Sequence, residues 1–224
     1  DGMLAELGLP IGPRAKLLGA IAKLNVPVAV AMTARAPAGV AEPHPEAERR
    51  QITILFSDLA DSTKLAVRLD PEDLSSLMQA YQHACAAVIE RYAGHIAQYM
   101  GDGIVAYFGW PIAQEDAAER AVRAGLDIVE AVKDLRSAEP LVVRVGINTG
   151  VVVISDTGKG DPSIPLGAVG ATPHVAARLQ ALAAPNSVVI SGTTSRLVAH
   201  LCDHEDLGPQ SLKGVAEPVH VFHV

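Results

Sequence analysis

The sequence is poor in aromatic residues and contains no long apolar run. Aromatic side chains make up 4% of the 224 residues, whereas hydrophobic residues make up 49%. A core built from this chain must therefore consist mostly of alanine, valine, leucine and isoleucine. The longest apolar stretch near a terminus, residues 26–32, contains Pro27 and is too short to cross a bilayer. We therefore expect no membrane segment in this chain.

Cysteine is nearly absent too. Cys85 and Cys202 form neither a CxxC pair nor a Cys/His pattern, which excludes a cysteine-based zinc site and favours free thiols in a reducing compartment. No signal peptide precedes them, so we expect a soluble cytoplasmic protein. Because the sequence opens at Asp1 rather than at a methionine, we also expect it to be a piece of a longer protein.

The chain lacks an excess of positive charge. Its 18 basic residues are outnumbered by 25 acidic residues, giving a formal charge of −7. A nucleic-acid-binding domain would show a basic patch or stripe, so we expect no nucleic-acid partner. This balance does not exclude a nucleotide that is bound through a metal ion.

The first 48 residues differ in composition from the rest. Residues 1–25 carry leucines and an isoleucine at helical spacing, and the pattern "ELG…GPRAKLLGAI" resembles the C-terminal end of a SAM domain. The alternative is an ordinary helix that packs on the main domain or on a partner. Residues 26–48 are rich in proline and alanine and are predicted to be a linker. The main domain is expected over residues 49–224.

Hydrophobic periodicity predicts alternating strands and helices in the main domain. Strand-like runs mix with helical runs of apolar residues, and Gly101-Asp102-Gly103 reads as a hairpin turn between two strands. This order predicts an α+β, ferredoxin-like (βαββαβ-type) fold with helices on one face of a sheet. The expected strands are 51–56, 95–99, 104–108, 141–154 (broken near 148–150), 188–190 and one within 212–224; the expected helices are 64–69, 71–93, 115–136, 170–183 and 194–201, with a loop over 155–165.

The stretch QITILFSDLADST, residues 51–63, is the main functional signal. An apolar strand is predicted to end at Phe56, with Asp58 just beyond it and a helix N-cap among Asp61, Ser62 and Thr63. A helix start offers free backbone N–H groups that suit phosphate, and a carboxylate beside them suits a divalent cation. The alternative is that Asp58 is only a turn or capping residue.

A second aspartate strengthens the case for a metal site. Asp102 lies at the tip of the predicted hairpin, which can neighbour the strand that leads to Asp58 in one sheet. Two carboxylates there could hold one or two Mg²⁺ or Mn²⁺ ions against a triphosphate. Asp-Gly is common in hairpins, so the pair is more informative than the turn alone.

Several ordered motifs resemble the catalytic domain of class III nucleotidyl cyclases of bacterial type. They are "RRQITILFSDLADST", "YMGDGIVAYFGWP", "EDAAERAVRAGL", "VRVGINTGVVV", "VGATPHVAARLQALA" and "LKGVAEPVHVF", and they span about residues 49–224. The resemblance implies a two-metal reaction in which the ribose 3′-oxygen of a nucleoside triphosphate attacks the α-phosphorus and pyrophosphate leaves.

The resemblance also implies roles for individual residues. Asp58 and Asp102 match the two metal-binding aspartates, Arg178 matches the arginine that stabilises the transition state, and Lys213 matches loosely a lysine that contacts phosphate. A surface salt bridge is the alternative role for Arg178. Backbone amides of one segment would cradle the phosphates: Phe56, Ser57, Leu59, Ala60, Asp61, Ser62 and Thr63.

Three positions depart from the family pattern. Gln98 replaces the base-reading lysine, Gly167 replaces its Asp or Thr partner, and His174 replaces an asparagine that orients the ribose. Gln98 can still donate and accept hydrogen bonds at a purine edge. His174 can donate to the ribose or can merely pack under its helix. These departures predict a slow or relaxed enzyme.

The family builds each site from two chains. Asp58 and Asp102 would come from one subunit, and Gln98, His174 and Arg178 from the other, which implies a homodimer with two shared sites. The leading interpretation is an adenylate cyclase that makes cyclic AMP for intracellular signalling. The alternatives are a degenerate nucleotide-binding or regulatory module and, third, a guanylate cyclase.

Overall fold

The computed structural model describes residues 48–135, 140–155 and 167–224. Every described residue belongs to one compact unit, which lies within residues 43–224. The SAM-like helix predicted over 1–25, the linker over 26–48 apart from its last residue, and nearly all of the loop over 155–165 lie outside the described residues.

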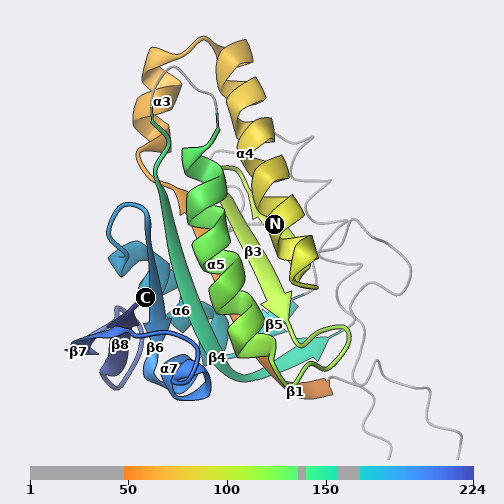
Figure 1. Ribbon diagram of the computed structural model, residues 1–224, viewed down its shortest axis with the longest axis vertical. Coiled ribbons are helices and arrows are strands. Elements are labelled where there is room, and N and C mark those ends of the chain that lie inside the picture. Colours follow the sequence, from red (N-terminus) through yellow and green to blue (C-terminus); the bar gives the residue numbers. More distant parts are fainter. Residues whose placement is uncertain (1–47, 136–139, 156–166) are drawn as a thin grey trace, which may run out of the picture. The chain divides into compact units, whose positions relative to one another are not determined.

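A mixed sheet forms the centre of the described unit (Figure 1). Its strand order is β2-β3-β1-β4-β6-β8-β7, and β5 pairs with β4 off this path. The first half of the fold contains β1 (Glu48–Leu59), α3 (Ser62–Arg68), α4 (Pro71–Arg91), β2 (His95–Met100), β3 (Gly103–Phe108), α5 (Ala117–Lys133) and β4 (Val143–Ser155). The second half contains β5 (Gly167–Val169), α6 (Ala171–Leu182), β6 (Ser187–Ser191), α7 (Gly192–Val198), β7 (Glu205–Gln210) and β8 (Val219–His223).

The first half confirms the ferredoxin-like prediction. β1 pairs antiparallel with β3 on one side and with β4 on the other, and β2 pairs antiparallel with β3. The chain reaches β2 and β4 through α4 and α5, so each helix crosses over a strand that lies between its two flanking strands. This is the split βαβ arrangement of the predicted α+β class.

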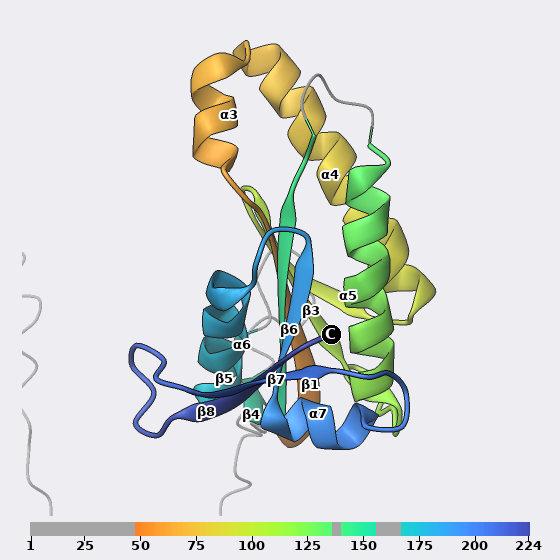
Figure 2. The same cartoon turned by 60° about the vertical axis from the view of Figure 1, so that its left-hand side comes forward.

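The placement of the helices differs from the prediction in one respect. Successive strand residues point to opposite faces, and Leu55 belongs to a core with residues of α4 and α5, whereas Ile54 belongs to a second core with Ala176 of α6. Figure 2 shows α6 on the side of the sheet away from α5. Helices therefore cover both faces, because both strand faces are apolar and each needs cover.

Several element boundaries also differ from the prediction. β4 runs without interruption from Val143 to Ser155, because Gly150 keeps its pairing with Ile52 and the predicted break near 148–150 does not occur. β5 and β7 were not predicted, since both are short and mostly exposed. The helical spacing of apolar residues in α5 predicts that Leu126 points into the core, but Leu126 is 36% exposed.

Helix α6 lies directly against β4 at Gly146. A methyl group added to Gly146 would come within 2.1 Å of the backbone nitrogen of Gln180 and 2.6 Å of the carbonyl oxygen of Ala176. The helix backbone therefore occupies the space that a side chain would need. This approach sets the distance between α6 and the strands that carry the candidate site.

We predict that Gly146→Ala destabilises the domain, because the clash is with helix backbone that cannot rotate away. Overpacking of this kind costs about 1–3 kcal/mol, or roughly 2–4 °C in melting temperature per kcal/mol for a domain of this size. Thermal unfolding measures the change. Gly167→Ala is the matched control, because an added methyl group there meets no atom within 4 Å. Equal melting temperatures for the two variants would contradict the prediction.

Candidate active site

The two predicted metal-binding aspartates lie on neighbouring segments, one near the end of β1 and the other in the turn between β2 and β3. Asp58 is not beyond the strand, as predicted, but inside β1, where its Cα partners are Gly103 of β3 and Arg144 of β4. The backbone N–H of Leu59 donates to the carbonyl oxygen of Asp102 over 3.1 Å. The strand extends past Asp58 because both neighbouring strands continue to pair with it. This pairing brings the two carboxylates together.

The charge state of Asp58 reflects this crowding. Burial raises the pKa of its carboxyl group above the ordinary value, and the neighbouring charge of Asp102 raises it further. Three groups oppose the increase by lowering the pKa: the side chain of Gln180, the guanidinium of Arg144 and the backbone of Leu59. Folding thus concentrates negative charge that a cation would neutralise.

The donor set fits a divalent cation that prefers oxygen. Both groups are carboxylates, which are the ligands that Mg²⁺ and Mn²⁺ favour. Among the residues that the structure describes, no group of three or more His, Cys, Asp and Glu side chains could hold a metal by itself. The aspartate pair would therefore share the ion with other oxygen ligands, as phosphate groups and water provide.

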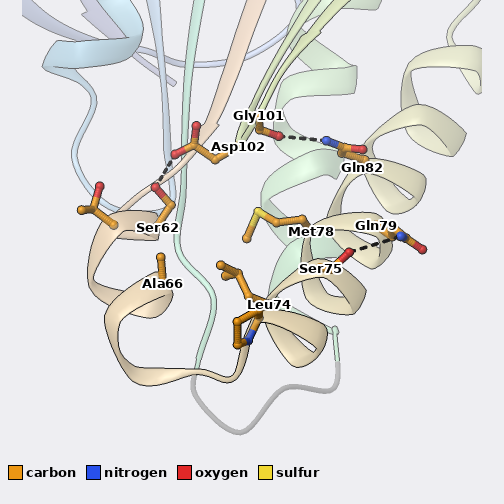
Figure 3. A pocket seen from close by; sticks show the side chains of 11 residues that line it. Ser62, Ala66, Leu74, Ser75, Met78, Gln79, Gln82, Gly101 and Asp102 are labelled. Carbon is orange, nitrogen blue, oxygen red and sulfur yellow. Dashed lines mark hydrogen bonds between the residues drawn. The ribbon is translucent and has the colours of Figure 1, made fainter.

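The start of helix α3 adjoins Asp102 (Figure 3). The hydroxyl of Ser62 donates to Oδ2 of Asp102. Asp61 is the N-cap residue in a left-handed conformation, and its side chain caps no N–H group but pairs with Nζ of Lys64 at 2.8 Å. Within the described residues, the backbone N–H groups of Asp61, Ser62 and Thr63 have no acceptor. These N–H groups remain available to an anion.

Only part of the predicted phosphate-binding segment, residues 56–63, has backbone N–H groups that are free to bind an anion. The amide of Leu59 donates to Asp102 and that of Ala60 donates to the carbonyl oxygen of Val142 over 2.7 Å, so both are already used. Ser57 is 1% exposed, and its hydroxyl bonds to the hydroxyl of Tyr81 over 2.9 Å. Ser57 therefore anchors α4 to the sheet, and Phe56 is likewise held in β1 by pairing with strands on both sides.

A groove of about 630 Å³ opens beside Asp102 between α3 and α4. In Figure 3 the side chains of Leu74 and Met78 reach toward it from α4, and Gln82 donates to the carbonyl oxygen of Gly101 over 2.8 Å. This bond ties the glycine-rich turn to α4. The turn that carries Asp102 is therefore supported from both sides.

Arg144 is a site residue that sequence reasoning missed. It lies opposite Asp58 in the sheet, and it lowers the pKa of Asp58. Among the described residues, its Nε is the one buried side-chain nitrogen or oxygen without a hydrogen-bond partner. A cation with unused donor capacity beside two carboxylates suits a phosphate group. The available signal was an arginine between Val143 and Val145 in an otherwise apolar strand.

The remaining predicted residues lie apart from the aspartates in this chain. Nε of Arg178 donates to the carbonyl oxygen of Lys213 over 3.2 Å, so these two residues adjoin each other. His174 is exposed on α6, one helical turn before Arg178. Gln180, which sequence reasoning also missed, is the α6 residue that contacts Asp58. Within one chain, the predicted residues therefore form two separate groups.

The predicted base-reading residues lie on strands that border the core on the α6 side of the sheet. Gln98 pairs with Val105, whose side chain belongs to the core on the α6 side of the sheet. The backbone N–H of Ala168, beside Gly167, donates to the hydroxyl of Tyr107 over 3.4 Å, and Tyr107 belongs to that same core. Gln98 thus lies on the face that carries Asp58, whereas Gly167 adjoins Ala168, which packs against the core on that face; both Gln98 and Gly167 are exposed.

Comparison with known proteins identifies the family. The model of the adenylate and guanylate cyclase catalytic domain matches residues 45–224. The chain belongs to this family. The matched cyclase domain contains both aspartates, Arg144 and all of α6.

Individual relatives agree with this assignment. An uncharacterised protein of Rhizobium meliloti is 42% identical over 179 residues, which cover 78% of this chain and 17% of that protein. The chain thus spans less than a fifth of the length of that relative. The adenylyl cyclase CyaB from P. aeruginosa superposes with a TM-score of 0.75 at 29% identity, covering 80% of this chain and 95% of that one.

A guanylate cyclase structure is nearly as similar. The guanylate cyclase domain of RhGC from Catenaria anguillulae, solved in complex with GTP, gives a TM-score of 0.74 at 25% identity, covering 80% of this chain and 98% of that one. The chain is therefore a nucleotidyl cyclase domain by family. In the part of the chain that the structure describes, no helix is both long and apolar enough to cross a membrane.

We predict that Asp58→Asn raises the melting temperature of the metal-free cyclase domain at pH 7. The pKa of Asp58 is higher in the folded state, so this group stabilises the fold below its unfolded pKa and loses that contribution as pH rises through the folded pKa. A neutral amide removes the penalty, and each kcal/mol gained raises the melting temperature by roughly 2–4 °C. Differential scanning calorimetry in the presence of a chelator, which keeps the protein metal-free, measures the melting temperature.

The gain in stability should shrink as the pH falls through the raised pKa of Asp58, because the wild-type carboxyl then becomes neutral in the folded protein. Glu115→Gln is the matched control, because Glu115 is exposed, so its substitution should leave the melting temperature nearly unchanged. A lower melting temperature for Asp58→Asn at pH 7 would contradict the prediction.

Proposed function

We propose that this cyclase domain is an adenylate cyclase that converts ATP to 3′,5′-cyclic AMP and pyrophosphate. The observation that carries the proposal is the convergence of Asp58 and Asp102 beside the partnerless guanidinium nitrogen of Arg144 and the free amides at the start of α3. Carboxylates and phosphate donors in one place suit a metal–triphosphate complex. Family membership supplies the reaction class.

Each residue has a defined task in this mechanism. Asp58 and Asp102 hold the divalent cations, and Arg144 together with the amides of residues 61–63 binds oxygens of the triphosphate. Two Mg²⁺ or Mn²⁺ ions, when bound, supply a lowered pKa for the 3′-hydroxyl and neutralise phosphate charge. The 3′-oxygen then bonds to the α-phosphorus as the bond to the β-phosphate oxygen breaks, and Arg178 stabilises the developing charge.

A homodimer completes the site in this proposal. Within one chain, Arg178 donates a hydrogen bond to Lys213 rather than to the aspartates. The exposed His174 lies on the same side of α6 as Arg178. A second chain placed head to tail would bring Arg178 and Lys213 to the triphosphate and His174 to the ribose. Two equivalent sites then form at one two-fold interface.

The choice of ATP over GTP rests on a curated adenylate cyclase relative rather than on the residues expected to contact the base. Gln98 carries no charge and can donate or accept, so it accommodates either purine edge, and Gly167 offers no side chain. The curated relative Adenylate cyclase 1 of Rhizobium meliloti, 27% identical over 184 residues, supports ATP. The solved guanylyl cyclase Cya2, 33% identical with a TM-score of 0.72, supports GTP. Guanylate cyclase activity is the second choice. Free cysteines and signalling by cyclic AMP fit a cytoplasmic domain.

A regulatory module without chemistry is the competing function. His174 and Gly167 favour it, because they replace groups that would position the ribose and the base. Loss of a positioning contact can cost about 10²-fold in rate. A slow enzyme and a binding module differ in one respect, which is whether product forms.

We predict cyclic AMP formation from ATP with Mn²⁺ or Mg²⁺ at high protein concentration, with less product from GTP. Asp58→Ala and Asp102→Ala should each lower the rate at least about 10³-fold, since several kcal/mol of transition-state stabilisation depend on the cations. Chromatography of the nucleotides measures this. Asp203→Ala, which removes an exposed aspartate beyond α7, should retain the wild-type rate.

The other outcomes assign a different function. Faster turnover of GTP than of ATP would make the domain a guanylate cyclase. Binding of ATP with Mn²⁺ but no product from either nucleotide, in a dimeric protein, would support the regulatory module.

We predict that two inactive variants restore activity when they are mixed. Asp58→Asn and Arg178→Ala each disable both sites of their own homodimers, but a mixed dimer retains one site with Asp58 and Arg178 intact. Random pairing makes half of the dimers mixed, so the activity should reach about a quarter of the wild-type value. Co-expression or refolding of the mixture, followed by the cyclase assay, tests this. No recovery in mixtures shown to exchange subunits would contradict shared sites.

A further inference from the structure

Helix α6 contacts the candidate metal site of its own chain through one side chain. Nε2 of Gln180 donates to Oδ2 of Asp58 over 3.4 Å, and the two residues are 122 positions apart. Gln180 is only partly exposed, so its amide is partly shielded from water, which would otherwise compete for the carboxylate. The contact is therefore a tertiary one, made where the helix crosses the sheet.

Backbone packing holds Gln180 in this place. The backbone nitrogen of Gln180 lies where a side chain on Gly146 would be, so α6 meets β4 at Gln180 itself. Gly146 is the register partner of Phe56, two residues before Asp58 on the same face of β1. This close approach of α6 to the sheet thus lies beside the aspartate, and it fixes the backbone from which the amide donor extends.

The hydrogen bond orients the carboxylate. It engages Oδ2, while a methyl group added at Gly103 would lie 3.5 Å from Oδ1, so Oδ1 faces the turn that carries Asp102. Rotation of the carboxylate would break the bond to Gln180. One oxygen is therefore fixed by α6, and the other is directed toward the second aspartate.

We propose that Gln180 is a positioning residue for metal binding: it holds the carboxylate of Asp58 in the orientation that lets Asp58 and Asp102 share divalent cations. The inference rests on the proposed function, because it takes Asp58 to be a metal ligand. Partners in the outer shell of a metal site typically change metal affinity 10–100-fold when they are removed. Arg178, two residues earlier, bonds elsewhere, so the role of Gln180 is separate.

The test is a titration of the full chain with Mn²⁺ in the absence of nucleotide, in which electron paramagnetic resonance monitors the binding. Gln180→Met keeps the length and much of the volume of the side chain but cannot donate, so its dissociation constant for Mn²⁺ should rise about 10-fold. Its melting temperature in chelator should stay close to that of the wild type. The matched control is Gln210→Met, which removes an amide bonded to the carbonyl oxygen of Leu207 and should not change Mn²⁺ affinity.

A second variant separates positioning from packing. Gln180→Asn keeps the amide but is shorter by one methylene group, so it cannot reach Asp58 and should also weaken Mn²⁺ binding about 10-fold. In the cyclase assay, both Gln180 variants should require a higher Mn²⁺ concentration for half-maximal rate and recover most of the rate at saturating Mn²⁺. A purely structural role would lower the melting temperature and leave the Mn²⁺ affinity of the folded protein unchanged.

Wild-type affinity in either Gln180 variant would overturn the inference, even with an active enzyme. The proposed function is judged separately, by Asp58→Asn. If the wild type binds Mn²⁺ no better than Asp58→Asn, the aspartates are not a metal site, and both proposals fail. If Asp58→Asn abolishes binding while Gln180→Met does not, only the role of Gln180 is wrong.

Discussion

The fold depends on the antiparallel pairing of β1 with a strand on each side. That pairing buries Leu55 against α4 and α5 and Ile54 against the core on the α6 side, so β1 anchors both apolar layers of the domain. It also places Asp58, near the end of β1, between Gly103 and Arg144. The same strand therefore contributes to stability and to the candidate site, because the pairing that forms the core also brings Asp58 next to Arg144 and the turn that carries Asp102.

The ionised carboxylate of Asp58 is unfavourable where it lies, although the strands around it are well paired. Burial and the charge of Asp102 raise the pKa of Asp58, while Arg144 and Gln180 partly compensate. Such an arrangement is typical of functional sites, where stability is given up for a group that binds a ligand. Bonds from Ser62 to Asp102 and from Gln82 to Gly101 hold the second carboxylate against α3 and α4. A bound cation would offset the electrostatic repulsion between the two aspartates.

Helix α6 belongs to both proposed halves of the active site. Gln180 contacts Asp58 in its own chain, whereas Arg178 bonds to Lys213 on the other side of the helix. Two positions along a helix differ by about 200° in direction, which accounts for this division. The close approach at Gly146 makes the helix a rigid connection between the two, since its backbone cannot shift toward the sheet.

The sequence by itself determined the family, the order of most elements and the pair Asp58 and Asp102, because apolar periodicity and short ordered motifs are local properties. It did not determine that Asp58 lies inside β1, that α6 covers the second face of the sheet, or that Arg144 and Gln180 reach the aspartates. Those facts depend on strand register and on helix-to-strand distance, which arise only when residues far apart in the chain pair and pack. The amides of residues 59–63 show the same division: the sequence marked the segment, and tertiary hydrogen bonds decided which N–H groups stay free.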